Sequence, residues 1–144
     1  MNIRPVQDGD DAALADLWRR CELTRPWNDP ASDIAFARAT PQSEIFVGER
    51  DGTIIASVMC GNDGHRGWVY YLAVSPDEQG EQLGRAMMTQ AEAWLRSLGV
   101  PKLELLIRNT NVKVAKFYET LGYKTEPVTV MSRWLKEPPE LPNG

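Results

Sequence analysis

The sequence has few residues of the types that bind metals, and it has no long apolar run. Its 144 residues include two cysteines, Cys21 and Cys60, and one histidine, His65. The spacing of the cysteines does not match a metal-ligand set, and a reducing compartment would keep both as thiols. No apolar stretch approaches the ~20 residues that a membrane-spanning helix needs, and the first residues lack the apolar region of a signal peptide. We therefore expect a cytoplasmic protein with no membrane partner and no bound metal.

The sequence also lacks a dense run of basic residues. Sixteen Lys and Arg side chains against twenty Asp and Glu give a formal charge of −4. Nucleic-acid phosphates are usually bound by a concentrated positive surface, so we expect no nucleic-acid partner. Hydrophobic residues make up 42% and charged residues 25%, which is typical of globular proteins and excludes disorder as the main state. The length suits one domain, assigned to residues 1–136, followed by a Pro-rich tail over 137–144.

Strand-like segments recur along the chain between turn residues. They lie at residues 3–6, 45–50, 53–59, 68–74, 102–108 and 123–136. Pro5 lacks an N–H donor, which favours an edge position for the first strand. Asp51-Gly52 predicts a tight hairpin between the second and third. The segment 68–74 is apolar without alternation, as in a central strand buried on both faces. A break is expected in the last segment near Glu126-Pro127.

Apolar residues at helical spacing predict four helices between these strands. They are a helix with Leu14, Leu17, Trp18 and Cys21 on one face, a weaker one over 30–40, a long one over 83–98, and a short one with Val114, Phe117, Tyr118 and Leu121. Asp8 or Asp11 could cap the first helix, and Gly99 and Gly122 end the last two. The resulting order, β-α-α-β-β-β-α-β-α-β, predicts an α+β (mixed α/β) fold. Its sheet is antiparallel at first and changes to a strand-helix-strand unit in the second half.

The turn that follows the central strand is a candidate anion site. After Val74 the chain passes through Gly80 and Gly84 into the long helix. Backbone N–H groups at a helix N-terminus bind phosphate well when glycines let the ligand approach. The alternative, that the two glycines only ease a strand-to-helix turn, is equally open on this segment alone.

Two motifs resemble those of the GNAT N-acetyltransferase superfamily. Residues 71–76, followed by 79–84, resemble its acyl-CoA loop, usually written Q/R-x-x-G-x-G/A. A later segment, with Tyr118 seven residues after Asn111, resembles its conserved Y-E-x-L-G-[FY] run. The resemblance covers nearly the whole chain. The loop over 24–30 and the segment 63–67 further resemble a small bacterial RimI-like subgroup, the YpeA type.

The resemblance implies a largely antiparallel sheet of about six to seven strands flanked by four helices, and acetyl-CoA as the cosubstrate. Tyr118 would be the general acid that protonates the leaving thiolate, which suits a phenol of pKa about 10. The alternative is that Tyr118 is only a core residue on the apolar face of its helix. The residues implied to bind the cofactor are Leu72, Ala73, Val74, Gln79, Gly80, Glu81, Gln82, Leu83, Gly84, Arg85, Asn111 and Phe117.

The loop departs from the family pattern at two points. Gln82 stands where the first loop glycine is usual, and Asp77, Glu78 and Glu81 outnumber Arg85. A negative loop is unfavourable beside a pyrophosphate. For stability we expect Gln82 to adopt an unstrained backbone conformation, since a helix N-terminus accepts glutamine readily. Replacing it with glycine should still raise the affinity for acetyl-CoA.

The general base is not fixed by the sequence. Relatives that modify protein N-termini often carry a glutamate five residues before the asparagine, where this chain has Leu106. Glu104 lies two positions earlier on the same face of the strand and is the first candidate. The alternative is that Glu104 is only a charged side chain that faces solvent. His65 is the second candidate. The alternative is that His65 only makes hydrogen bonds within its own turn. Without either, water would accept the proton.

The early loop, residues 24–30, is expected to form a wall of the acceptor site. The alternative is that it is a packed connector that its prolines stiffen. The candidate substrate-binding residues are Arg25, Trp27, Asp29, His65 and Tyr71. The hypothesis is an acetyl-CoA-dependent N-acetyltransferase that acts on a primary amine by direct transfer. The sequence leaves open whether the acceptor is a small molecule, a peptide N-terminus or a lysine. It also leaves open whether the chain forms a homodimer. The rivals are a weakened acyl-CoA-binding or interaction module on the same fold, and a purely structural domain.

Overall fold

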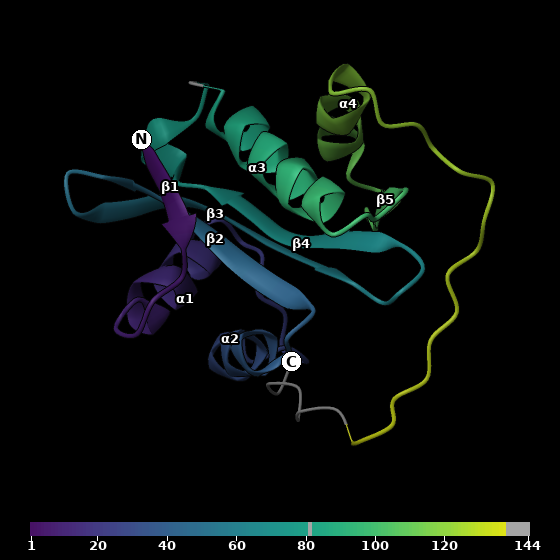
Figure 1. Ribbon diagram of the computed structural model, residues 1–144, viewed down its shortest axis with the longest axis horizontal. Helices are drawn as coiled ribbons and strands as arrows, with labels where there is room; N and C mark the ends of the chain where they lie inside the picture. The colour runs from purple at the N-terminus through teal and green to yellow at the C-terminus, as the bar shows by residue number, and fades with distance from the viewer. Residues whose placement is uncertain (81, 138–144) are drawn as a thin grey trace.

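The computed structural model describes residues 1–80 and 82–137. Within them the chain forms five strands, four α-helices and one 3-10 turn, in the order β1 (Asn2–Pro5), α1 (Asp11–Arg20), α2 (Pro30–Ala39), β2 (Ser43–Arg50), β3 (Thr53–Asn62), β4 (Gly67–Val74), η1 (Pro76–Glu78), α3 (Leu83–Ser97), β5 (Leu103–Leu105) and α4 (Val112–Thr120) (Figure 1). The mixed α+β class and the four helices are therefore confirmed.

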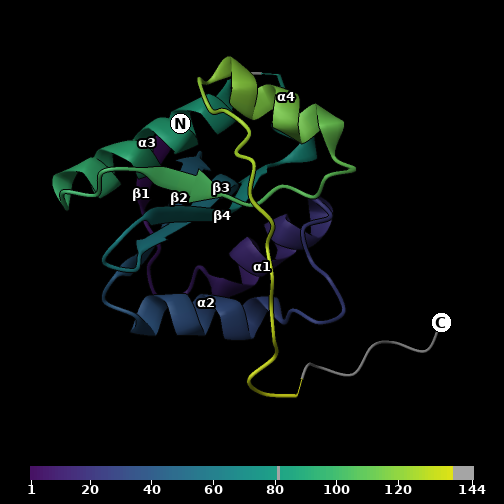
Figure 2. The same cartoon turned by 90° about the vertical axis from the view of Figure 1, so that its right-hand side faces the viewer.

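The five strands form one sheet in the order β1-β2-β3-β4-β5. Neighbouring strands are antiparallel except β4 and β5, which are parallel and joined by α3. Helices α1 and α2 cover one face of the sheet, and α3 and α4 cover the other (Figure 2). Each face has its own apolar cluster, one around Trp18 and Ile34 and the other around Met87 and Val58. The sheet therefore separates two packed layers.

The expected strand count of six to seven is wrong for the described residues. No described strand follows β5, and residues 123–137 form no ladder with the sheet. The fifth strand is also shorter than the expected 102–108, because its pairing with β4 spans only Leu103 to Leu105. Alternating apolar residues make a segment able to pair, but a strand also needs a neighbour within hydrogen-bonding distance.

The hairpin and the helix boundaries follow the local sequence closely. Asp51 and Gly52 both have positive φ, 53° and 79°, as the expected two-residue turn requires. The expectation that β4 is buried on both faces is wrong in part. Tyr70 is exposed and Tyr71 and Leu72 are only partly buried, and the two tyrosines line an open pocket instead of a packed layer.

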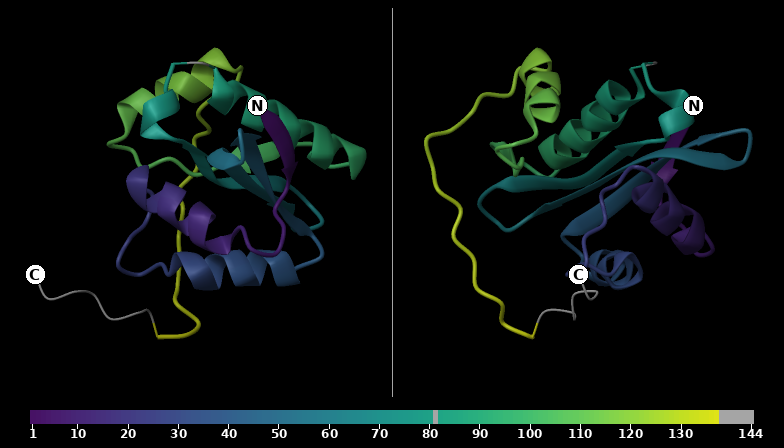
Figure 3. Two further views of the ribbon diagram at one scale, coloured as in Figure 1. Left: turned by 90° about the vertical axis from the view of Figure 1, so that its left-hand side faces the viewer. Right: turned by 180° about the vertical axis from the view of Figure 1, so that it is seen from behind.

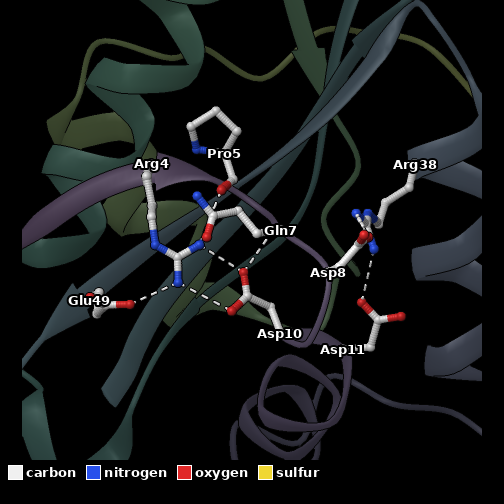
Figure 4. A network of polar contacts seen from close by, with 8 residues as sticks. All are labelled: Arg4, Pro5, Gln7, Asp8, Asp10, Asp11, Arg38 and Glu49. Carbon is white, nitrogen blue, oxygen red and sulfur yellow. Dashed lines mark hydrogen bonds and ion pairs between the residues drawn. The ribbon is translucent and has the colours of Figure 1, made fainter. Parts of the chain in front are cut away.

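A polar network ties the N-terminal strand to the first helix (Figure 4). The guanidinium of Arg4 donates to both carboxylate oxygens of Asp10, at 2.7 and 3.1 Å, and to Glu49 at 2.8 Å. The residue preceding α1 is Asp10, so neither Asp8 nor Asp11 caps this helix as expected. The Arg4 guanidinium holds the pKa of Asp10 below its usual range. The network fixes where β1 leaves the sheet and α1 begins.

The single-domain assignment of 1–136 stays a prediction, and all of the expected tail except residue 137 lies outside the described residues.

Candidate functional site

A bulge in β4 lies beside an opening between β4 and β5, at one side of the sheet. The register against β3 shifts between Ser57 and Met59, so that Tyr71 and Leu72 stand opposite one residue of β3. Tyr71 has a φ of 52°, which is rare for a non-glycine residue. Beyond the last β4–β5 pair, Val69 with Leu105, β4 continues to Val74 without β5 beside it. The two parallel strands therefore diverge, and they leave an unpaired stretch of β4 edge.

Backbone acceptors on this stretch face away from β3. The Val74 carbonyl accepts a hydrogen bond from Gln79 Nε2 at 2.7 Å and another from Cys21 Sγ at 3.2 Å. Both partners are side chains from outside the sheet, so this carbonyl points into the opening. A ligand that paired with it as an extra strand would have to displace the Gln79 amide.

The N-terminus of α3 lies directly after this opening. The helix begins at Leu83, and Gln82 precedes it with φ 61° and ψ 23°, a left-handed conformation, without a side-chain cap. The expectation that Gln82 is unstrained is therefore wrong, because the turn into α3 needs a positive φ at this position. Gly80 also has a positive φ, 87°, and a Cβ there would meet nothing within 4 Å. The glycine leaves open space in front of the helix.

Helices α3 and α4 meet the end of β4 at Gly84. A Cβ on Gly84 would come within 3.1 Å of the Phe117 ring and 3.8 Å of a Val74 methyl group. Glycine at this position lets α4 pack closely against the start of α3.

Nine of the predicted cofactor residues lie along β4 and the turn into α3, namely Leu72, Ala73, Val74, Gln79, Gly80, Gln82, Leu83, Gly84 and Arg85. Glu81 lies outside the described residues.

The turn is less negative in space than along the sequence. Arg50, at the end of β2, pairs with Glu78 at 2.8 Å. Counting charges within the loop alone missed this cation because it comes from a distant strand.

Asn111 precedes α4 and accepts a hydrogen bond from the Val114 N–H at 3.3 Å, so its side-chain oxygen caps a helix while its amide nitrogen is left to donate.

Tyr118 is almost completely buried on the α3/α4 side of the sheet. Its ring contacts Phe117 and Tyr123 edge-on, with centroids 5.1 and 5.7 Å apart. Burial raises its pKa to about 12, so the phenol keeps its proton throughout the physiological range. The neighbouring Tyr123 hydroxyl is committed elsewhere, since it donates to Glu92 at 2.6 Å.

A pocket of about 460 Å³ lies on the opposite face, beneath the bulge. Tyr71 forms one wall and stacks on Trp18, with ring centroids 3.8 Å apart. Its hydroxyl donates to Asp33 on α2 at 2.5 Å. Burial, together with the Asp33 carboxylate, raises the pKa of Tyr71. The pocket is also lined by Leu23, Asn28, Phe36, Ala37, Ser43, Met59 and Tyr70.

The early loop serves mainly local contacts. The Asp29 carboxylate accepts from the Ala31 N–H at 3.3 Å and the Ser32 hydroxyl at 2.7 Å, which caps α2. Arg25 donates to backbone carbonyls of its own loop. Trp27 reaches further, because the Arg108 guanidinium lies 5.5 Å from its ring centroid. That contact joins the early loop to the segment between β5 and α4.

The two candidate bases lie at the paired end of β4. His65 belongs to the turn between β3 and β4, where the Asp63 carboxylate accepts hydrogen bonds from the His65 and Arg66 backbone N–H groups. Glu104 pairs with Arg66 at 3.2 Å. Neither side chain lines the pocket beneath the bulge, so the structure does not bring either candidate to Asp33.

Sequence reasoning missed Asp33 and most of the residues around it, although it named Tyr71 and placed the early loop, which contributes Asn28, at the acceptor site. They come from α2, β2, β3, β4 and the early loop, and no local motif links them. The one available signal was the aromatic pair Tyr70-Tyr71 in a strand expected to be wholly buried. Among residues 1–80 and 82–137 there is no group of three or more metal-ligating side chains, and no helix there is long and apolar enough to cross a membrane.

Comparisons with known proteins agree with this geometry. The model of the "Acetyltransferase (GNAT) family" matches residues 12–123. An "Acetyltransferase" of Yersinia pestis is 41% identical over 136 residues, which covers 94% of this chain and 96% of that protein. Another from Pectobacterium atrosepticum is 40% identical over 137 residues, covering 95% and 97%.

Solved structures show the same fold at low sequence identity. A putative acetyltransferase from Agrobacterium tumefaciens superposes with a TM-score of 0.79 at 19% identity, covering 93% of this chain and all of that chain. The structure of AAC(6')-Iy in complex with the bisubstrate analog CoA-S-monomethyl-acetylneamine also gives 0.79, at 13% identity, with 92% and 97% covered.

Proposed function

The chain belongs to the GNAT acetyltransferase family, and from this premise we propose that it transfers an acetyl group from acetyl-CoA directly to a primary amine. The observation that carries the proposal is the opening between β4 and β5. A helix N-terminus and a buried tyrosine lie on one side of the sheet there, and an acidic, aromatic pocket lies on the other. An amine held in the pocket can meet a thioester in the opening.

Three features fit the acetyl-CoA molecule. The unpaired edge of β4 offers backbone groups to the amide-containing pantetheine arm, as an added strand would. The first N–H groups of α3 and the open space at Gly80 suit a pyrophosphate. The Asn111 amide nitrogen is available to donate to the arm. The likeness to AAC(6')-Iy, solved with a CoA-containing analog, supports the same placement.

When bound, acetyl-CoA supplies the thioester carbonyl that the amine attacks and the sulfur that leaves. Tyr118 holds its proton through burial and donates it to that sulfur. Because the raised pKa makes proton donation uphill, the proton should move only as the carbon–sulfur bond breaks. A backbone N–H near Leu72 to Val74 stabilises the charge that develops on the carbonyl oxygen.

Asp33 supplies the charge that an amine acceptor needs. Its carboxylate lines the pocket and bonds the Tyr71 hydroxyl, so an incoming ammonium group would pair with it beside the opening. The Asp33→Asn substitution should raise the acceptor KM several-fold and leave the acetyl-CoA KM within about two-fold. Asp16→Asn, on the exposed face of α1, is the matched control. Equal effects of both variants on acceptor KM would contradict this role.

Glu104 is kept as the proposed general base and, because it does not line the pocket, it would take the amine proton through a water molecule; solvent alone is its alternative. Its ion pair with Arg66 must break before it accepts a proton. Glu104→Gln should lower kcat with little change in the acetyl-CoA KM, whereas an unchanged kcat assigns the proton to water.

The test of the proposed function is release of free CoA thiol, followed with a panel of amines that includes aminoglycosides, peptides with free N-termini and lysine peptides. Calorimetry with acetyl-CoA, CoA and ATP runs beside it. We expect acetyl-CoA to bind and ATP not to bind, with acceptor-dependent thiol release. Acetyl-CoA binding without turnover on any amine would instead favour the weakened acyl-CoA-binding module, which the strained Gln82 and the occupied Val74 carbonyl also suggest. The cytoplasm is the proposed location, in keeping with two free cysteines.

A further inference from the structure

The pocket beneath the bulge combines one charged end with an apolar body. Of the nine residues that line it, Asp33 is the only one with a charged side chain. The Asp33 carboxylate accepts from the Tyr71 hydroxyl. Apart from Asn28 and Ser43, the remaining lining is apolar or aromatic, namely Leu23, Phe36, Ala37, Met59 and Tyr70. The pocket therefore offers one negative charge and a wall of carbon.

Carboxylates of neighbouring segments do not add to this charge. The Asp29 carboxylate caps α2, and Glu104 is held in an ion pair. Glu44 belongs to β2, but its side chain lies on the other face of the sheet, because the next residue, Ile45, packs on the face that α1 and α2 cover. Among the described residues, a second ammonium group in the pocket would therefore find no second carboxylate on its wall.

The strand register gives the pocket a direction. Tyr71 lies at the bulge, beside the opening between β4 and β5. Tyr70 is paired with Met59 and is one step further from the opening. Ser43 lies further still, where the start of β2 pairs with the end of β3. The charged end of the pocket is therefore its end nearest the opening, and the apolar body extends away from it.

Helix α2 follows the same direction. It runs beneath the sheet, next to α1 (Figure 3). Phe36 and Ala37 come about one helical turn after Asp33 and share its face. The step from Asp33 to Ala37 is about 6 Å along the helix axis. An amine whose nitrogen meets Asp33 therefore lays its carbon chain along the next turn of α2.

The size and exposure of the pocket suit a whole small molecule. Its volume of about 460 Å³ lies in the range of pockets that enclose most of a small ligand. Phe36 is 76% exposed and Tyr70 is 46% exposed, so an apolar body placed against the two rings removes carbon surface from water. A lysine side chain of a protein would bring its polar backbone to the same rings.

We propose that the acceptor is a small primary monoamine with an apolar body, whose ammonium group pairs with Asp33 while its body lies along Met59, Tyr70 and Phe36. This inference rests on the proposed function, because it names the class of amine that the same site accepts. Polycationic amines are disfavoured, since their second charge would lie against carbon without a partner.

Two amines of equal length test the preference. Hexylamine and hexamethylenediamine have the same carbon chain, but the diamine has a second amine at its far end. We expect kcat/KM to be about tenfold higher for hexylamine, and to rise about threefold to fourfold per methylene from butylamine to hexylamine. We also expect Nα-acetyl-lysinamide to react less well than hexylamine. An equal or higher kcat/KM for the diamine or the lysine derivative, or no dependence on chain length, would overturn the proposal.

A second carboxylate on the pocket wall should change the preference. Phe36→Asp places one a helical turn from Asp33, at an exposed position where the substitution leaves the core intact. The matched Phe36→Asn removes the ring without adding a charge. We expect the ratio of kcat/KM for hexylamine over the diamine to be at least fivefold lower in Phe36→Asp than in Phe36→Asn. The same ratio in both variants would show that the body of the amine does not lie along α2.

The inference and the proposed function fail in different ways. Acetyl-CoA binding without thiol release from any amine would contradict the proposed transfer. Calorimetric titration of the chain saturated with CoA then still measures the preference of the pocket. Hexylamine should bind about tenfold more tightly than the diamine, and equal affinities would overturn the proposed class of acceptor.

Discussion

Replacing Gln82 with glycine should stabilise this protein. Gln82 lies in the left-handed region, at φ 61° and ψ 23°, immediately before α3. Its side chain makes no capping hydrogen bond, so the substitution removes no cap. The backbone carbonyl that accepts from the Ala86 N–H at 3.2 Å is retained in the variant.

The expected gain is the difference between two opposing contributions. A non-glycine residue in this region costs roughly 1–2 kcal/mol relative to glycine. Glycine in turn makes the unfolded chain more flexible, which costs about 0.4–1 kcal/mol. The net effect is a stabilisation of about 0–1.6 kcal/mol, and its midpoint of about 0.8 kcal/mol corresponds to a rise in Tm of roughly 2–3 °C for a chain of this length.

Urea denaturation and calorimetry measure the effect, and Gln90→Gly is the matched control. Gln90 lies inside α3, where the same substitution should destabilise by roughly 0.5–1 kcal/mol. Loss of stability in both variants would refute the argument from strain. Acetyl-CoA should bind Gln82→Gly more tightly, because the backbone becomes easier to approach. Weaker binding would show that the Gln82 amide itself holds the phosphate.

Three further predictions concern single contacts. Asp10→Asn should destabilise by about 1–3 kcal/mol at pH 7 because it removes the charged partner of Arg4. The folded pKa of Asp10 lies below its unfolded value of about 3.9. The stabilisation by Asp10 is therefore present above a pH of about 3.9 and is lost as the pH falls through the folded pKa. The urea midpoints of variant and parent should converge at that low pH. Asp29→Ala should cost about 1 kcal/mol through the lost α2 cap, and a changed acceptor KM at unchanged stability would contradict that role. Gly84→Ala should lower Tm and the affinity for acetyl-CoA, because its Cβ comes within 3.1 Å of Phe117; an unchanged Tm would show that α4 yields freely.

Features encoded by neighbouring residues could be predicted from the sequence. The Asp51-Gly52 turn needs two positive φ angles, and these residue types adopt them at low cost. The helix faces follow from apolar spacing in the same way. The strand over 123–136 was wrong because Val128 and Val130 make a segment competent to pair without supplying a partner. β5 was predicted too long because a bulge on another strand ends its pairing.

The site divides along the same lines. The turn into α3 and the position of Tyr118 come from contiguous motifs, so the sequence could suggest them. Asp33 could not be found, because the pocket forms only when α2 packs against β2 and brings Asp33 to the Tyr71 hydroxyl. The strain at Gln82 was missed because glutamine suits a helix start by composition, whereas the direction of the incoming chain decides its backbone conformation.

The most direct test of the account is the kcat of Tyr118→Phe with a working acceptor, compared with Tyr123→Phe. Both variants remove one hydroxyl from the same aromatic cluster, but the Tyr123 hydroxyl is held by Glu92. We expect Tyr118→Phe to lower kcat on the order of 10²-fold, with acetyl-CoA affinity within a few-fold, and Tyr123→Phe to lower mainly Tm. An unchanged kcat in Tyr118→Phe, with chemistry shown to be rate-limiting, would contradict the account.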